Sequence, residues 1–289
     1  MVQEFKSAAR RVRSHRMLCL TVLMAMRNVR ELVAPLARPA AHVVVVDVPT
    51  RSHFGGLPNL APDVRWPERD GTPLTFLARL SLSELQRAQA FDWLPTSGAL
   101  LFFYDFEEPP WGNHPNDCEF FSVLHVPDLT FMASPEAAST DDAGRSLPHR
   151  NVGFRPIQSL PSVQIIPGER ELIREGDLTE KELKDYVELT EEEFRGTLKN
   201  QVGGFPWPMQ WDTMELDCQL ASHGLYSHEH NSLRAIELSP GAADWRLLFQ
   251  IDEDEVINKL FGSMIYFWVR EQDARAGVFE YAWVTAQCD

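Results

Sequence analysis

The densest group of possible metal ligands lies between residues 223 and 230. It comprises His223, His228 and His230, with Glu229 between the last two. Imidazole and carboxylate groups bind zinc, and a His-x-His pair in a loop supplies two ligands. No third and fourth donors are identified, however, and the His-Glu-x-x-His spacing of metalloproteases is absent. We interpret these residues as histidines of an exposed loop and predict neither a metal nor another cofactor.

Other patterns give no better case for catalysis. The acidic run 252–255 lacks the glycine and the terminal glutamate of a calcium loop, so we interpret it as acids at a helix N-terminus, where the helix dipole favours them. No Gly-x-Ser-x-Gly is present, and no cysteine lies in a recognisable nucleophile motif, although a Cys/His pair assembled only in space stays open. The sequence therefore favours a protein that is not an enzyme.

The four cysteines indicate the cellular compartment. Cys19, Cys118, Cys218 and Cys288 are widely scattered and form no Cys-x-x-Cys pair. This pattern is typical of reduced thiols rather than of a disulfide framework or a zinc site. We therefore expect a cytoplasmic protein.

Charge is distributed unevenly along the 289 residues. The net charge is −15, but residues 1–38 carry eight basic and two acidic side chains, so the rest of the chain carries −21. Such a surface repels nucleic acid and attracts a basic protein. No apolar run approaches the roughly 18 residues of a membrane span. We expect a basic protein partner, no nucleic acid and no membrane; the oligomeric state stays open.

The N-terminus imitates a secretory signal, because residues 10–16 are basic and residues 17–26 are apolar. Arg27, Arg30 and Glu31 interrupt the apolar run, and no convincing cleavage site follows. We predict a loosely ordered basic arm and an amphipathic helix over 17–35. A start at Met17 is an alternative.

Two glycine doublets organise the remaining chain. Phe-Gly-Gly-Leu-Pro carries Gly55, Gly56 and Pro58, and Val-Gly-Gly-Phe-Pro carries Gly203, Gly204 and Pro206. Paired glycines permit positive φ or close approach of another chain segment, and the proline fixes the turn. Neither copy has the spacing of a phosphate-binding loop. We favour structural turns over ligand loops.

Each doublet precedes a similar series of elements. FLARLS (76–81), a helix and GALLFF (98–103) follow the first, and LLFQID (247–252), a helix and GSMIYF (262–267) follow the second. The order indicates two degenerate repeats in an α+β fold with mixed, largely antiparallel sheets, an N-terminal helix and short peripheral helices. The strands are predicted at 42–48, 73–82, 99–106, 119–126, 154–166, 245–252, 264–269 and 279–285.

The organisation along the chain follows from these elements. Residues 1–40 form the basic arm and first helix, 41–168 the first half, and 169–289 an acidic helical insert with the second half; residues 30–289 make one compact unit. Capping-box spacing at Thr179 and Thr190 predicts two short helices, starting near 180 and 191. Residues 134–149 have the composition of a mobile surface loop.

The glycine turns and the strands around them carry a family resemblance. From about residue 30 onward the chain resembles the YwqG-like proteins, a bacterial family of unknown function, through the motifs at 54–58, 66–67, 73–78, 203–206 with Gln210, 245–250 with Gln250, and the aromatic strand after Gly262. Arg79 stands where glutamine is expected, and Ser263-Met264 replaces an expected glycine. A more distant similarity to PDCD2-like chaperones lacks their zinc ligands. Neither resemblance supplies catalytic residues.

Three hypotheses follow. The first is a protein-binding module, namely an immunity protein that neutralises a cognate toxin of a bacterial secretion system, since the resemblance implies an association with toxin gene neighbourhoods. The second is a chaperone for a basic client such as a ribosomal protein, and the third is a hydrolase whose site is assembled from separated residues. The partner-binding candidates are Trp111, Trp207, Trp211, His228, His230, Asp252, Glu253 and Asp254.

Overall fold

The computed structural model of the protein describes residues 29–58, 60, 63–126, 147–161, 178–196, 200–210, 213–252 and 263–288. Its main feature is a ten-stranded sheet in the order β12-β11-β10-β9-β1-β8-β2-β5-β6-β7. Every pairing between these strands is antiparallel. The predicted α+β class is confirmed, and the sheet is antiparallel rather than mixed across the described strands.

The first half contributes one side of this sheet. Its elements are α2 (Val29–Val33), η1 (Ala34–Leu36), β1 (Arg38–Val45), β2 (His53–Phe54), the small hairpin β3 (Glu68–Arg69) and β4 (Thr72–Pro73), β5 (Thr75–Ser81), α3 (Leu82–Ala88), β6 (Ala99–Tyr104), η2 (Pro115–Glu119) and β7 (Phe121–Val126).

The second half of the structure begins at β8, which lies inside the range 41–168 predicted for the first half, and it contributes the other side. Its elements are β8 (Arg150–Ser159), α4 (Glu180–Gly196), β9 (Gln201–Gly203), α5 (Met214–Ala221), η4 (Ser227–Glu229), α6 (Leu233–Leu238), η5 (Ser239–Asp244), β10 (Trp245–Asp252), β11 (Ser263–Arg270), α8 (Glu271–Arg275) and β12 (Trp283–Cys288). Each predicted strand overlaps a strand of the structure, whereas the short strands β2 and β9 were expected only as turns.

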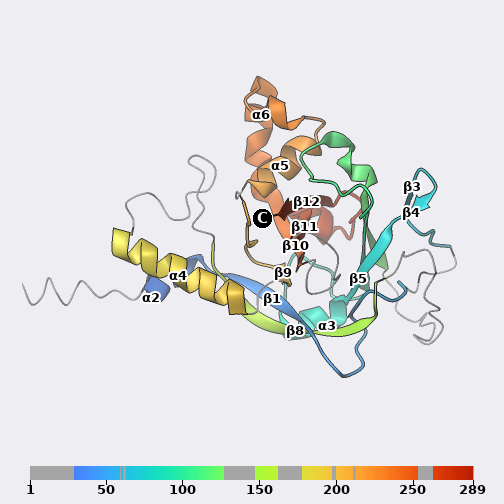
Figure 1. Cartoon of the computed structure of the whole chain (residues 1–289), viewed down its shortest axis with the longest axis horizontal. Coiled ribbons are helices and arrows are strands. Elements are labelled where there is room, and N and C mark those ends of the chain that lie inside the picture. The colour runs from blue at the N-terminus through green and yellow to red at the C-terminus, as the bar shows by residue number, and fades with distance from the viewer. Residues whose placement is uncertain are drawn as a thin grey trace, which may run out of the picture.

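The two halves exchange their leading strands. β1, from the first half, pairs with β9 of the second half, and β8, from the second half, pairs with β2 of the first. β1 and β8 pair with each other at the centre of the sheet. Figure 1 shows β1 and β8 running side by side below the other strands. The strand order therefore reads the same outward from β1 and β8 on both sides, which gives two interlocked half-sheets.

Equivalent hydrogen bonds anchor the two halves. The backbone N–H of Ser81 in β5 donates to Ser52 Oγ (2.9 Å), and that of Asp252 in β10 donates to Asn200 Oδ1 (2.8 Å). The carbonyls of Ser52 and Asn200 in turn accept from the exchanged strands β8 and β1, at 2.9 and 2.8 Å. One short polar residue before each glycine doublet thus ties a half-sheet to the strand it receives.

The glycine doublets turn the chain where it meets the exchanged strands. Gly55, Gly56, Gly203 and Gly204 all have positive φ, between 55° and 74°. A Cβ on Gly204 would lie 2.6 Å from the Cβ of Ser159 and 2.8 Å from that of Ala40. Both the backbone conformation and the space therefore require glycine at this turn.

A side chain in β2 and its counterpart in β9 support these turns. His53 Nδ1 lies 2.8 Å from the carbonyl oxygen of Gly55, and Gln201 Nε2 donates to the carbonyl of Gly203 at 3.1 Å. Burial lowers the pKa of His53 from its usual 6.5 to about 4. This histidine is therefore neutral at pH 7 and fills the place that a glutamine fills in the other half.

The sheet curves so that its two halves face each other across an aromatic core. Phe102 of β6 contacts Phe249 of β10 and Phe267 of β11, with ring centroids 5.0 and 5.1 Å apart. Phe54 of β2 stacks on Phe249 at 6.3 Å. All four rings are fully buried. Edge and offset contacts between such rings add to the hydrophobic effect of their burial.

Helices and loops cover the outer faces. α5 packs over the second half, where Trp245 Nε1 donates to Gln219 Oε1 at 2.9 Å. The segment with Trp66 and Leu74 covers the first half, against Phe103. Figure 1 shows α5 and α6 above the second half-sheet, and α2 beside α4 at the other end of the molecule.

The acidic segment contains one helix where two were predicted. Thr179 and Glu182 form the expected capping box, since each side chain accepts from the other residue's backbone N–H, at 3.3 and 2.7 Å. α4 then continues past Thr190, whose hydroxyl donates to the Tyr186 carbonyl one turn earlier (3.1 Å). The second capping box was a wrong prediction, because a buried threonine in a helix satisfies its hydroxyl in this way.

Several predictions fall outside the described residues. These are the basic arm, most of the helix over 17–35, most of the loop over 134–149 and the helix after Asp252. Within the described part of the chain, none of the helices combines the length and the apolar character needed to cross a membrane.

Gly204→Ala should destabilise the protein strongly. The new Cβ would overlap Ser159 and Ala40 at a φ of +74°, so we expect a loss of about 3 kcal/mol in the free energy of unfolding. Gly71→Ala is the matched control, because Gly71 has a φ of +80° but open space around its Cα. It should cost only about 1 kcal/mol. Urea unfolding measures both; equal losses would show that packing at Gly204 is unimportant.

His53→Gln should remove part of the acid sensitivity of the fold. Because the pKa of His53 is near 4 in the folded protein and near 6.5 in the unfolded chain, the unfolded chain binds more protons between these pH values. The free energy of unfolding is therefore unaffected by His53 above pH 6.5 and decreases as the pH falls towards 4. Over that interval the wild type should lose about 3 kcal/mol through this group. The glutamine, copying Gln201, keeps a donor for the turn. The free energy of unfolding of the wild type and of the variant is measured at pH 7 and at pH 4.5. If both proteins lose the same free energy between these pH values, His53 is not the source of the acid sensitivity.

Candidate functional site

The two outer edges of the sheet approach each other without pairing. Among the described strands, β7 has no partner beyond β6, and β12 has none beyond β11. The loop before η2 bridges them: Trp283 Nε1 donates to the Gly112 carbonyl (2.7 Å), and the backbone N–H of Ala286 donates to the Trp111 carbonyl (3.3 Å). A seam therefore runs between β7 and the segment leading into β12.

Aromatic contacts form the floor of this seam. The rings of Phe121 in β7 and Trp283 in β12 lie 5.8 Å apart, and those of His125 and Phe279 lie 5.4 Å apart. Phe121, Trp283 and Phe279 belong to the main core, so the floor of the seam is its outer boundary.

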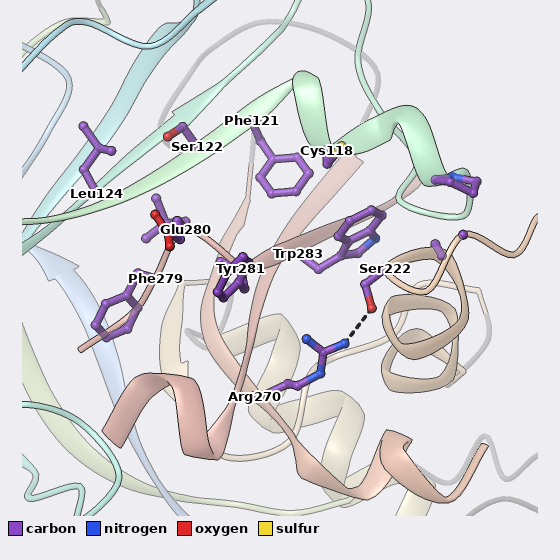
Figure 2. A pocket seen from close by; sticks show the side chains of 15 residues that line it. Cys118, Phe121, Ser122, Leu124, Ser222, Arg270, Phe279, Glu280, Tyr281 and Trp283 are labelled. Atoms are coloured by element: carbon purple, nitrogen blue, oxygen red, sulfur yellow. Dashed lines mark hydrogen bonds between the residues drawn. The ribbon is translucent and has the colours of Figure 1, made fainter. Parts of the chain in front are cut away.

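A cavity of about 490 Å³ lies along the seam. Figure 2 shows side chains from β7, from the turn before β12, from the end of β11 and from the end of α5 surrounding it. Pockets of 300–1,000 Å³ are typical of ligand sites. The lining residues are Pro115, Cys118, Phe121, Ser122, Val123, Leu124, Ala221, Ser222, Gly224, Arg270, Phe279, Glu280, Tyr281, Ala282 and Trp283.

Arg270 is the one cation among these lining residues. Its guanidinium stacks over the ring of Trp245 at 4.5 Å and donates to Ser222 Oγ at 2.8 Å, as the dashed line in Figure 2 shows. Asp273 lies 3.8 Å away and partly balances its charge. The guanidinium is therefore held in place before any ligand binds.

The thiol of Cys118 is exposed but is not activated. Desolvation, followed by the charges of Glu119 and Asp117, raises the pKa of this thiol above its usual value. Cys218 is buried, and burial raises the pKa of its thiol further. A nucleophilic cysteine needs a lowered pKa, so neither thiol has the environment of one.

Three exposed aromatic residues lie in the cavity lining or in the segments next to it. Tyr281 lines it and is 58% exposed, and Trp111, whose carbonyl bonds β12, is 52% exposed. Tyr226 stands beside the lining residue Gly224; its ring contacts His114 edge-on at 4.5 Å and stacks on His228 at 5.7 Å. We call Trp111, Tyr226 and Tyr281 the aromatic rim.

The structure separates the predicted partner-binding residues. Trp111 belongs to the aromatic rim and His228 stacks on its Tyr226, whereas His230 lies 3.7 Å from Asp217. Trp207 is half-buried, and its backbone N–H and carbonyl are bonded to Gln250 and Tyr266. Asp252, at the end of β10, is only 5% exposed. We expected it on the surface, and this prediction was wrong. Trp211, Glu253 and Asp254 lie outside the described residues.

The histidine cluster is dispersed. His223 Nδ1 lies 2.6 Å from the Gln219 carbonyl oxygen, while His228 faces Tyr226 and His230 faces Asp217. Across the described ranges, no three His, Cys, Asp or Glu side chains meet in a way that could hold a metal ion.

Desolvation raises the pKa of Asp217, and the Thr213 hydroxyl donates to its carboxylate.

Sequence reasoning missed most of the cavity. Arg270, Ser222 and Tyr281 follow from no motif, because three elements distant in sequence bring them together. The glycine after Trp111 is the sequence feature that could have indicated this site. Gly112 has a φ of +84°, and a Cβ there would overlap the Val284 carbonyl. A glycine in a loop often marks such a close approach of two backbones.

Comparison with known protein families identifies a match. A family model described as "Domain of unknown function (DUF1963)" matches residues 52–288. A search of the curated proteins finds no significant match. The matched region includes both glycine doublets and all of the seam.

Trp283→Phe should loosen the loop that closes the seam. The change removes the indole N–H and leaves the Gly112 carbonyl without that donor, at a cost of about 1–2 kcal/mol. Hydrogen exchange in residues 107–119 should become faster. Trp268→Phe is the control, since Trp268 Nε1 donates to Thr285 Oγ1 inside the fold. If both variants change exchange in this loop equally, the Trp283 bond does not hold it.

Proposed function

The chain belongs to the DUF1963 family, whose description assigns no activity, and on this premise we propose that the protein is a non-enzymatic module that binds a basic protein. Within the family we group it with the YwqG-like proteins, because of the residues at 54–58 and 203–206. The observation that carries the proposal is the seam: a preformed cavity with an apolar floor, beside exposed aromatic side chains.

Aromatic residues beside a desolvated pocket are typical of binding hot spots. Trp and Tyr are enriched among the residues whose truncation costs most binding energy. Trp111 and Tyr281 are both more than half exposed, although folding usually buries side chains of this size. A partner covering the aromatic rim would bury them.

Charge supports a basic partner. The chain beyond residue 38 carries −21, and Glu119 and Glu280 are exposed beside the seam. A field of this sign steers a cationic protein towards the surface and raises its association rate. The dependence of that rate on ionic strength gives a direct measure of the effect.

The environment of the possible nucleophiles favours binding over hydrolysis. The pKa of the Cys118 thiol is raised, and the Ser222 hydroxyl accepts from Arg270 and donates to the Gln219 carbonyl at 3.3 Å. His223 Nδ1 is engaged by the Gln219 carbonyl. These contacts support a role in recognition for the residues around the cavity.

The partner that we favour is a toxin of a bacterial secretion system, neutralised in the cytoplasm by direct occlusion. The unpaired Cys118, Cys218 and Cys288 suit a reducing compartment. A chaperone of basic proteins would use the same surface, but it would bind ribosomal proteins and would not depend on a neighbouring gene.

Co-expression with the products of adjacent genes, followed by size-exclusion chromatography and calorimetry, tests the proposal. We expect one product to form a stable complex. Trp111→Ala and Tyr281→Ala should each raise Kd by about tenfold or more, because each removes an aromatic side chain that the partner would bury. Leu183→Ala, at an exposed apolar residue on α4, should have no effect. The proposal fails if no adjacent product binds, and a ribosomal protein in the complex instead would favour the chaperone.

A further inference from the structure

The hydrogen-bonding phase of β7 shows which of its backbone groups face the seam. The N–H of Asp105 donates to the Phe120 carbonyl at 2.8 Å, in the register that pairs Tyr104 with Phe121. Opposed residues of an antiparallel pair alternate between bonded and non-bonded. Ser122 and Leu124 therefore bond to β6, whereas the N–H and C=O groups of Phe121, Val123 and His125 point away from it.

The cavity follows this outward edge. Four consecutive β7 residues, 121–124, line one side and five consecutive residues, 279–283, line the other. Successive side chains of a strand point to opposite faces, so a surface touched by every residue is the edge of the strand. Figure 2 shows the side chains from these two segments facing each other across the cavity.

The opposite edge is already occupied in part. In β12 the outward-pointing N–H of Ala286 donates to the Trp111 carbonyl, so the loop acts as a short cover there. Within the described residues, no other segment makes such a backbone bond to Phe121, Val123 or His125. The free edge next to the cavity is thus that of β7.

Resting on the proposed function, we infer that the partner binds by strand addition: an extended segment of the basic protein pairs with the outer edge of β7, inside the seam. The backbone of Phe121, Val123 and His125 supplies the hydrogen bonds that give affinity. The apolar floor takes alternate side chains of the segment and supplies selectivity.

The chemistry of the seam defines the segment. Its side chains on the floor are apolar, because Phe121, Val123, Phe279 and Trp283 form that floor. Its outward side chains are basic, because Glu119 and Glu280 stand exposed at the two sides. Arg270 does not reverse this preference, since Asp273, Ser222 and Trp245 already engage its guanidinium.

The test uses the full chain and an extended probe peptide. Four lining residues of β7 extend for about 13 Å, which a peptide of about seven residues covers with overhang. The probe alternates lysine with valine or phenylalanine. We expect its addition to slow amide exchange at Phe121, Val123 and His125 by at least about tenfold, and to leave Ser122 and Leu124, which bond to β6, unchanged.

Two matched peptides isolate the interactions. A probe N-methylated at alternate residues, along the edge that would face β7, should bind at least about tenfold more weakly, because it cannot complete the backbone bonds. A probe with glutamate in place of lysine should also bind more weakly than the lysine probe. In the Glu280→Gln variant of the protein, the difference in Kd between these two probes should be smaller. None of these changes alters the core of the protein.

Several results would overturn strand addition. They are the absence of any protection of the β7 amides at millimolar probe, equal binding of the N-methylated probe, and preference for the glutamate probe. Binding of phenylpropionate beside Arg270, without protection of β7, would instead identify a site for small aromatic carboxylates. If the adjacent-gene product binds through Trp111 and Tyr281 but leaves the β7 amides exchanging, the proposed function stands and strand addition fails.

Discussion

The rest of the structure depends on the exchange of β1 and β8 between the two half-sheets. Each glycine doublet must bend the chain against a strand that belongs to the other half, which is why a Cβ on Gly204 would overlap Ala40 and Ser159. Ser52 and Asn200 complete the arrangement, since each bonds both its own half and the received strand. Backbone geometry, rather than a catalytic constellation, dominates this part of the molecule.

The seam is a consequence of the same symmetry. A sheet built outward from a central pair has its two last strands, β7 and β12, at opposite ends, and curvature brings these ends together. A closed barrel would have no free edge. Here a loop, two aromatic contacts and one indole hydrogen bond complete the wall, and a cavity remains where strand pairing would otherwise have continued.

Local patterns predicted much of the fold. Short apolar runs located the longer strands, and the repeated glycine doublets indicated the duplication. The strand exchange was not predictable, because β2 and β9 are too short to show any periodicity. The site was less accessible still: Trp111 was selected for its type and its loop, but Arg270 and Tyr281 acquire their places only through tertiary contacts. Asp252 shows the opposite failure, since an acidic run suggested a surface position for a residue that β10 buries.

The exchanged strands also have a consequence for how the chain is made. During synthesis β1 emerges early, yet its neighbours β8 and β9 begin only at residues 150 and 201. More than a hundred residues must leave the ribosome before either edge of β1 finds its partner, which gives a fold of high contact order. Until then a β-branched strand stands unpaired, and nascent chains in this state are prone to aggregate. The symmetry that interlocks the finished protein thus leaves its first half dependent on the second for completion.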